Sequence, residues 1–219
     1  MMHTRRKLMK ILLAAAAGVT LLFGKAGLGL QWAYAKAKKV ILPKGTEMSE
    51  LVAKNPAKLD TRNLETSPMT EFDVMGQTNH PVNIGDWRLH VSGAVTQPGQ
   101  FTYDDLLKMP AVERNVLLIC PGFFAYNGLW KGITMETFLK AVGFKPEATH
   151  VKFSGPKGIS RKSKRFAIDE VMADKVFLAY QVNGEPLPER HGYPLRLVAE
   201  DHYGGRWVKY VDKVIVVAK

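Results

Sequence analysis

The chain has 219 residues, enough for one domain with extensions and too few for two full domains. Its hydrophobic content of 46% is ordinary for a globular protein, so a sizeable core is expected. The net charge of +11 is unevenly distributed, because residues 1–35 hold five basic and no acidic side chains. The rest of the chain has 26 basic and 20 acidic side chains. This excess fits a solvated basic surface and gives no indication of nucleic-acid binding.

Residues 1–35 have the pattern of a targeting segment and are set aside from the fold prediction. Basic residues precede the apolar run 11–23, and Ala33-Tyr34-Ala35 offers a cleavage site of small residues. Thr4-Arg5-Arg6-Lys7-Leu8-Met9-Lys10 resembles the twin-arginine (Tat) signal, which predicts export by the Tat translocase to the periplasm and cleavage near Ala35. The alternatives are a Sec signal that starts with two arginines and an uncleaved anchor, for which the apolar run is short.

Residues 36–86 are polar and interrupted by proline and glycine, and their only periodic pattern is a short helical one at 49–54. We expect residues 36–69 to form an extended N-terminal arm that crosses the surface of a domain made by residues 70–219. A disordered leader is the alternative.

From residue 87 onward the pattern changes to short strands and short helices. Strands are predicted at residues 87–93, 115–119, 151–153, 176–182, 195–199 and 214–218. Helices are predicted at 102–107 with Thr102 as N-cap, from Thr134 to 142, and at 169–173. Because strands outnumber helices, the sequence predicts an α+β fold, a mixed domain with a β-rich core.

Several common sites are absent from the sequence. It has no Cys-x-x-Cys for cysteine-held clusters or covalent haem, no phosphate-binding Gly-x-x-x-x-Gly-Lys loop and no Gly-x-Ser-x-Gly elbow. The histidines are not paired at zinc-ligand spacing, although a zinc site from Cys120, His191 and His202 is conceivable.

Cys120 is the only cysteine, so it cannot form an intramolecular disulfide. It ends an apolar strand and is followed by Pro121 and Gly122, which leaves its sulfur near a loop. The residue is therefore an inert buried thiol, an intermolecular link or a metal ligand, since thiolate is a strong, soft ligand.

A second candidate segment collects cations and glycines near the C-terminal end. It runs from His191-Gly192-Tyr193-Pro194-Leu195-Arg196 to Tyr203-Gly204-Gly205-Arg206-Trp207-Val208-Lys209. Guanidinium groups and exposed backbone N–H groups suit a phosphate, and glycines allow close approach. Each part alone has a simpler explanation, a salt-bridged arginine or a tight turn.

Taken together, the cysteine strand with Trp130-Lys131-Gly132-Ile133, residues 177–188 and the cationic segment resemble the sulfite-oxidase superfamily of molybdopterin-binding domains. The resemblance covers about residues 70–217 and includes periplasmic relatives such as methionine-sulfoxide reductase catalytic subunits. It implies a Mo-molybdopterin cofactor (molybdenum with its pyranopterin) with Cys120 as metal ligand and catalytic residue. It also implies cofactor contacts from His191, Arg196, Arg206, Trp207, Val208 and Lys209 and, by looser alignment, Glu71, Phe72 and Ser154.

The sequence departs from the family around the expected substrate site. Sulfite oxidases of the family carry an asparagine and arginines after the cysteine, and methionine-sulfoxide reductases carry a glutamate where this chain has Gly122. Phe123, Phe124 and Tyr126 stand there instead, either lining an apolar pocket or packing in the core.

The resemblance implies oxygen-atom transfer to or from a small-molecule substrate. Electrons would be exchanged with a haem partner, a membrane b-type or soluble c-type cytochrome, because this chain has no haem motif. The basic stretch 157–165 could dock that partner or steer an anion, although a solvated loop is the simpler explanation. Tyr126, Tyr203 and His202 are candidate proton donors. The alternative function is a non-catalytic binding or assembly module with the same fold.

Overall fold

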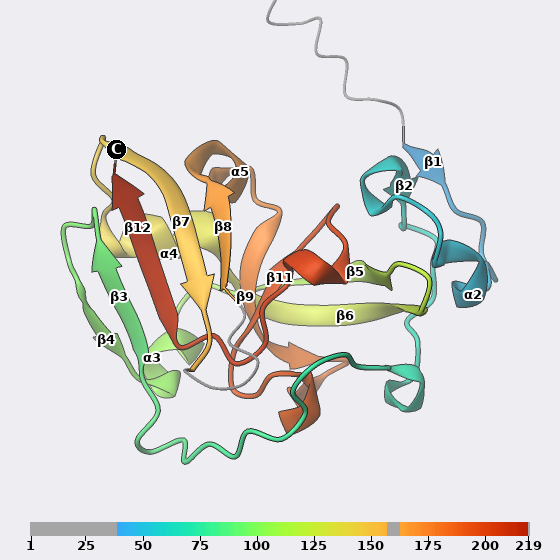
Figure 1. Ribbon diagram of the computed structural model, residues 1–219, viewed down its shortest axis with the longest axis horizontal. Helices are drawn as coiled ribbons and strands as arrows, with labels where there is room; N and C mark the ends of the chain where they lie inside the picture. Colours follow the sequence, from blue (N-terminus) through green and yellow to red (C-terminus); the bar gives the residue numbers. More distant parts are fainter. Residues whose placement is uncertain (1–38, 157–162, 219) are drawn as a thin grey trace, which may run out of the picture. The chain divides into compact units, whose positions relative to one another are not determined.

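The computed structural model describes residues 39–156 and 163–218, which include two five-stranded sheets, four α-helices and short 3-10 turns (Figure 1). The predicted targeting segment, the first residues of the arm and positions 157–162 of the basic stretch lie outside the described residues.

The first sheet carries Cys120 and is antiparallel throughout. Its strand order is β10-β9-β6-β5, with β11 also paired to β9. The strands are β5 (Val112–Cys120), β6 (Phe124–Thr134), β9 (Val176–Val182), β10 (Glu185–Pro186) and β11 (Arg196–Ala199). The turn predicted at Asn183-Gly184 joins β9 to β10. This arrangement brings the end of the cysteine strand and the arginine strand into one sheet.

The sequence missed β6, the longest strand, because Asn127, Gly128 and Gly132 break its apolar pattern. The pairing of β6 with β9 shifts register between Lys131 and Gly132. A Cβ at Gly132 would lie 2.1 Å from the carbonyl oxygen of Leu178, so only glycine allows the strands to approach at this bulge.

The second sheet has the order β4-β3-β12-β7-β8, in which β3 and β12 are parallel and the other pairs antiparallel. Its strands are β3 (Leu89–Gly93), β4 (Gly99–Phe101), β7 (Ala148–Ser154), β8 (Ser163–Ala167) and β12 (Lys213–Ala218). The sequence missed the short edge strands β4 and β8.

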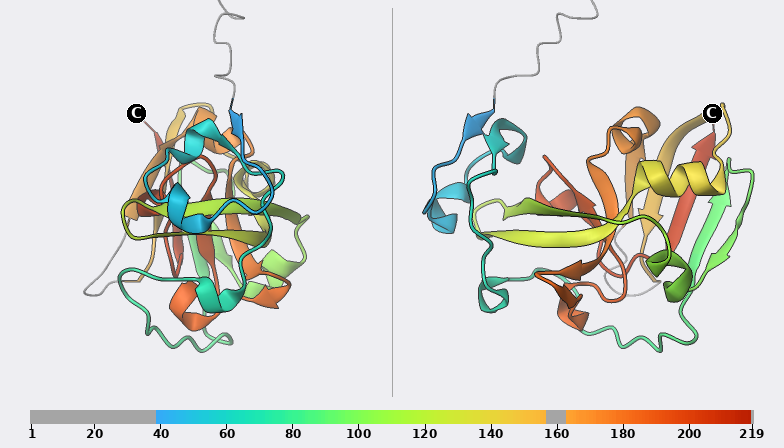
Figure 2. Two further views of the ribbon diagram at one scale, coloured as in Figure 1. Left: turned by 90° about the vertical axis from the view of Figure 1, so that its right-hand side faces the viewer. Right: turned by 180° about the vertical axis from the view of Figure 1, so that it is seen from behind.

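Four short α-helices lie between the strands: α2 (Met48–Leu51), α3 (Tyr103–Leu107), α4 (Met135–Val142) and α5 (Ile168–Met172). The 3-10 turns are Pro56–Lys58, Met69–Glu71, Glu189–His191 and Gly204–Arg206. Thr102 caps α3 in a capping box with Asp105, and the Thr134 hydroxyl caps α4, as the sequence predicts. Figure 2 shows α4 lying across strands of the second sheet. The apolar face of α4 joins the main core, where Phe138 meets Phe101 of β4 with ring centroids 5.5 Å apart.

The described part of the arm folds on the back of the cysteine strand. Strands β1 (Val40–Ile41) and β2 (Leu59–Asp60) pair in parallel within it. Its buried leucines form a small apolar cluster with side chains of β5 and β6, which comprises Leu42, Leu51, Leu59, Leu64, Leu117, Ile119 and Ala125. Residues 39–69 thus carry two short strands, helix α2 and the 3-10 turn Pro56–Lys58.

The prediction of a β-rich α+β fold is confirmed. All six predicted strands are present, and their bounds agree with the structure within a few residues. The strands that the sequence missed lie where glycine or an edge position weakens the alternation of apolar and polar residues. Within residues 39–156 and 163–218, no helix is both long and apolar enough to cross a membrane.

Candidate molybdopterin site

Cys120 stands at the last position of β5, where the hairpin to β6 turns. Alternation along β5 sends Leu117 and Ile119 into the arm cluster, and places Leu118 and Cys120 on the side of the main core. Gly122, with φ of +77°, makes the turn, and Cys120 pairs with Phe124 across it. The half-buried thiol donates to the Met75 thioether sulfur at 3.0 Å, among other contacts.

The Cys120 side chain opens into a cavity of about 410 Å³. Four segments far apart in the sequence make its wall, and their lining residues are Asp73 to Gln77, then Leu118, Cys120, Phe124 and Tyr126, then Arg196, and finally Gly204, Gly205, Trp207, Lys209 and Tyr210. Its size is that of a site for a small molecule or cofactor. Of the predicted site residues, Cys120, Arg196, Trp207 and Lys209 therefore share one cavity.

Arg196 is the buried cation of this wall, with 5% of its surface exposed. Its guanidinium carbon lies 5.2 Å from the ring centroid of Trp130 and 5.3 Å from that of Trp207, and Nη1 donates to the His191 carbonyl at 2.8 Å. Cation–π contacts with two indoles, the hydrogen bond to His191 and a side-chain hydrogen bond with Tyr126 fix the guanidinium in place. Nε of Arg196 has no hydrogen-bond partner among the described residues and is available to a ligand.

Several buried polar atoms around the cavity have no hydrogen-bond partner among the described residues. They are Arg196 Nε, Trp207 Nε1, His191 Nδ1 and, farther from the cavity wall, Ser154 Oγ. An unpaired buried polar group costs about 1–3 kcal/mol, so a fold that holds several is suited to a bound acceptor. A pterin with a phosphate presents ring and phosphate acceptors, which suit the unpaired donors of Arg196 and Trp207 that line the cavity.

His191 is buried beside this donor set and lies edge-on to Phe72, with ring centroids 5.8 Å apart. Burial, together with the nearby charges of Arg196, Arg190 and Lys209, lowers its pKa to about 3. The imidazole is therefore neutral at physiological pH, and it offers one donor and one acceptor nitrogen rather than a charge.

The other predicted contacts do not line the cavity. Val208 is fully buried and bridges to Leu197, and Arg206 stacks 4.2 Å over the Phe166 ring and donates to the Arg165 carbonyl. Ser154 and Phe72 are buried behind the wall, and Glu71 is exposed in a 3-10 turn. His191 is not among the lining residues either, so it lies next to the cavity and does not face it directly.

Sequence reasoning missed the segment of residues 73–77 and Tyr210. Residues 73–77 have no strand or helix pattern, and only Gly76, with φ of +75°, marked a turn there. Lys209 Nζ and Tyr210 Oη both donate to the Gln77 carbonyl, the latter at 3.3 Å. Nothing in the local sequence indicates that Met75 meets Cys120, because this contact joins residues 45 positions apart.

The aromatic side chains after Cys120 divide between the cavity and the surface. Phe124 and Tyr126 line the cavity with nearly parallel rings, and Tyr126 stacks on Phe72 with centroids 4.0 Å apart. Phe123 sits on the turn and is 70% exposed, so the expectation that it lines a pocket or packs in the core is wrong. Burial raises the pKa of Tyr126, and Arg196 offsets only part of that rise, so the phenol stays protonated.

The conceivable zinc site is not formed. Among the described residues, no three His, Cys, Asp or Glu side chains converge in a way that could hold a metal ion. His202 instead pairs with Glu170, with 2.5 Å between Nε2 and Oε1.

Comparison with known proteins identifies the class to which this fold and cavity belong. Residues 75–219 match the family described as the oxidoreductase molybdopterin binding domain, and the chain belongs to this family. The expected resemblance and the molybdopterin cofactor class are thereby confirmed.

Individual relatives show how far the similarity extends. The chain is 33% identical over 161 residues to inducible nitrate reductase [NADH] 2 of Glycine max, covering 60% of this chain and 18% of the relative. It is 30% identical over 153 residues to the protein-methionine-sulfoxide reductase catalytic subunit MsrP of Gluconobacter oxydans (strain 621H), covering 63% and 48%. The crystal structure of the sulfane dehydrogenase SoxCD from Paracoccus pantotrophus matches with a TM-score of 0.60 and 30% identity, covering 64% of this chain and 40% of that chain. The chain thus spans less than half the length of each of these relatives.

Proposed function

We propose that this protein is a molybdenum-dependent oxidoreductase that transfers an oxygen atom to or from a small substrate, with Cys120 as the protein ligand of the metal. When bound, the molybdenum–pterin group supplies two-electron redox chemistry coupled to gain or loss of oxygen by the substrate. The single observation that carries the proposal is the shared cavity, in which the only thiol faces Arg196, Trp207 and Lys209.

Each wall residue has a role that follows from its chemistry. Cys120 would provide a thiolate, and binding to a highly charged metal ensures its deprotonation. Arg196, Lys209 and the backbone at Gly204 and Gly205 would hold the pterin and its phosphate, since cations and exposed N–H groups suit anionic oxygens. The protein thereby orients the group and offsets its negative charge.

Tyr126 is the best placed of the three candidate proton donors. It lines the cavity with a protonated phenol, whereas Tyr203 packs against the arm cluster and His202 pairs with Glu170. We infer that the Tyr126 phenol would supply a proton to an oxygen atom of a substrate bound in the cavity. The neighbouring Phe124 and Tyr126 rings exclude water from that side of the cavity.

The partner and location follow from sequence patterns and are part of the proposal. The twin-arginine pattern supports export by the Tat translocase, and MsrP is described as a catalytic subunit, which implies a separate subunit. Because the sequence has no cysteine pair for covalent haem or iron–sulfur clusters, a haem partner would exchange the electrons.

Metal and pterin analysis of the natively expressed protein tests the proposal. We expect about one molybdenum and one pterin per chain, with the molybdenum lost in Cys120→Ser and kept in Ser92→Ala, a small substitution at an exposed position of β3. Dye-coupled turnover with sulfoxides, N-oxides and oxyanions then tests catalysis. A folded, exported but metal-free protein would support the non-catalytic module, with which the missing oxyanion residues after Cys120 are consistent. A fully loaded protein without any dye-coupled turnover would overturn the enzymatic proposal.

A further inference from the structure

The N-terminal arm lies outside residues 75–219, the part of the chain that matches the family, and yet it contacts both loops that flank the cavity. Its leucine cluster packs on Leu117 and Ile119, the residues that alternate with Leu118 and Cys120 along β5. The arm therefore supports the cysteine strand from the face opposite to the cavity.

The arm also holds the turn that follows Cys120. The backbone N–H of Gly122 donates to the Val52 carbonyl at 3.1 Å. Val52 ends α2, and the neighbouring Leu51 is buried in the arm cluster, so this acceptor has a fixed position. The bond lies two residues from the thiol and constrains the only turn that connects Cys120 to the rest of the hairpin.

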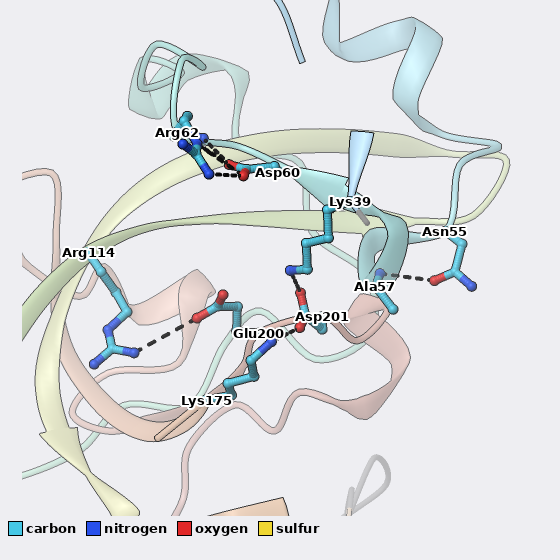
Figure 3. Close-up of polar contacts among 9 residues, drawn as sticks. All are labelled: Lys39, Asn55, Ala57, Asp60, Arg62, Arg114, Lys175, Glu200 and Asp201. Atoms are coloured by element: carbon cyan, nitrogen blue, oxygen red, sulfur yellow. Dashed lines mark hydrogen bonds and ion pairs between the residues drawn. The ribbon is translucent and has the colours of Figure 1, made fainter. Parts of the chain in front are cut away.

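A second contact ties the start of the arm to the glycine loop of the cavity. The Lys39 ammonium pairs with the Asp201 carboxylate, which also pairs with Lys175 (Figure 3). Asp201 has a φ of +68°, and the turn it begins leads into Tyr203, Gly204 and Gly205. Tyr203 packs against the arm cluster, and both glycines line the cavity.

We propose that the arm is a positioning element that fixes two loops, residues 121–123 and 201–205, and thereby sets where the thiol and the glycine loop stand. Lys39 and Leu51 are its positioning residues; neither lines the cavity. The arm would fix the two loops whether or not a cofactor binds. Only the expected effect on cofactor retention rests on the proposed function.

Amide hydrogen exchange of the metal-free full chain tests this directly. In Leu51→Ala, the Gly122 amide should exchange about five to ten times faster, the factor that corresponds to one weakened backbone hydrogen bond. In Lys39→Met, the amides of Arg206 and Trp207, which donate to Tyr203 and Gly204, should exchange faster, and Lys39→Arg should restore them. Lys44→Met is the matched control, because Lys44 belongs to the same arm and pairs with Glu65 at 3.1 Å while 78% exposed.

Each outcome decides the proposal. Local acceleration with an unchanged midpoint of thermal unfolding supports it, and so does faster pterin loss from the loaded protein in Lys39→Met than in Lys44→Met. Should Leu51→Ala speed exchange throughout the chain, Lys39→Met decides, since it removes a single, partly buried ion pair and leaves the arm cluster intact. Unchanged exchange at Arg206 and Trp207 in Lys39→Met overturns the proposal, whether or not the protein turns out to be an enzyme.

Discussion

The two sides of the cavity are built differently. On one side, Cys120 ends β5, Arg196 begins β11 and Trp207 is 1% exposed, so hydrogen-bonded strands and a packed core fix these three side chains. On the other side, residues 73–77 belong to no strand or helix, and Met75 is 52% exposed. The buried cation and the thiol are therefore on the strand side, and the opposite wall is a loop of irregular structure.

Contacts near the surface help to retain the loop side. The Gln77 carbonyl accepts from Lys209 and Tyr210, and farther on the His80 N–H donates to Glu189 Oε1 at 2.8 Å. These bonds lie near the surface, where each contributes little to stability. We therefore expect substitutions on the strand side to affect cofactor binding strongly, and those on the loop side to affect mainly access to Cys120.

Arg196→Met should give the largest effect. It removes the buried cation and leaves the His191 carbonyl without its donor, so the affinity for pterin should fall about 10- to 100-fold, the worth of one charge-assisted hydrogen bond. Pterin content after purification measures this. Arg196→Lys should recover little, because an ammonium lacks the planar fork that stacks between Trp130 and Trp207. Full pterin loading of Arg196→Met would contradict the expectation that the strand side of the cavity dominates cofactor binding.

Lys209→Met should have an intermediate effect, because Lys209 touches both sides. We expect about a tenfold loss of pterin affinity from the missing charge. In the metal-free protein, Cys120 should react faster with a neutral maleimide, since the Gln77 carbonyl has lost a donor. Tyr210→Phe removes only the longer hydrogen bond to the Gln77 carbonyl. It should therefore change the rate of maleimide labelling of Cys120 less than Lys209→Met does.

His191 predicts a pH dependence of the metal-free protein. Its pKa is about 3 when folded, below the ordinary 6.5, so between these values the unfolded chain binds a proton that the folded chain does not. Stability should therefore decrease as pH falls from 6.5 toward 3, by on the order of 1 kcal/mol or more, since one pKa unit corresponds to about 1.4 kcal/mol. Urea unfolding of the wild type and His191→Phe at pH 7 and 5 measures this. An equal loss of stability on acidification in both proteins would show that His191 is not held neutral.

Met75→Ala should give the smallest effect. Because the side chain is half exposed, the free energy of unfolding should change by no more than about 0.5 kcal/mol. The thioether covers the thiol, so its removal should speed maleimide labelling of Cys120 a few-fold. A large loss of stability, or unchanged labelling, would mean that residues 73–77 do not act as a loop that covers the thiol.

The strand side of the site was largely accessible from the sequence, and the loop side was not. Cys120 follows an apolar run, and Arg196 and Lys209 stand in one short motif, so local patterns mark them. The support of the arm depends on Val52 and Asp201, which meet Gly122 and Lys39 only after folding. Strand β6 was missed for a similar reason: its glycines are required by the approach of β9, which a single-strand pattern cannot reveal.

The parallel pair β3–β12 bears on the order in which the molecule can be assembled. During synthesis β3 can pair with β4 as soon as both are made. Its other neighbour, β12, is synthesised only after every residue that lines the cavity. Pairings between such distant segments form slowly, because a long loop must close before any contact is gained. We therefore expect a large cofactor that is synthesised elsewhere to bind only after the chain has been translated through β12. Cofactor insertion would then follow translation.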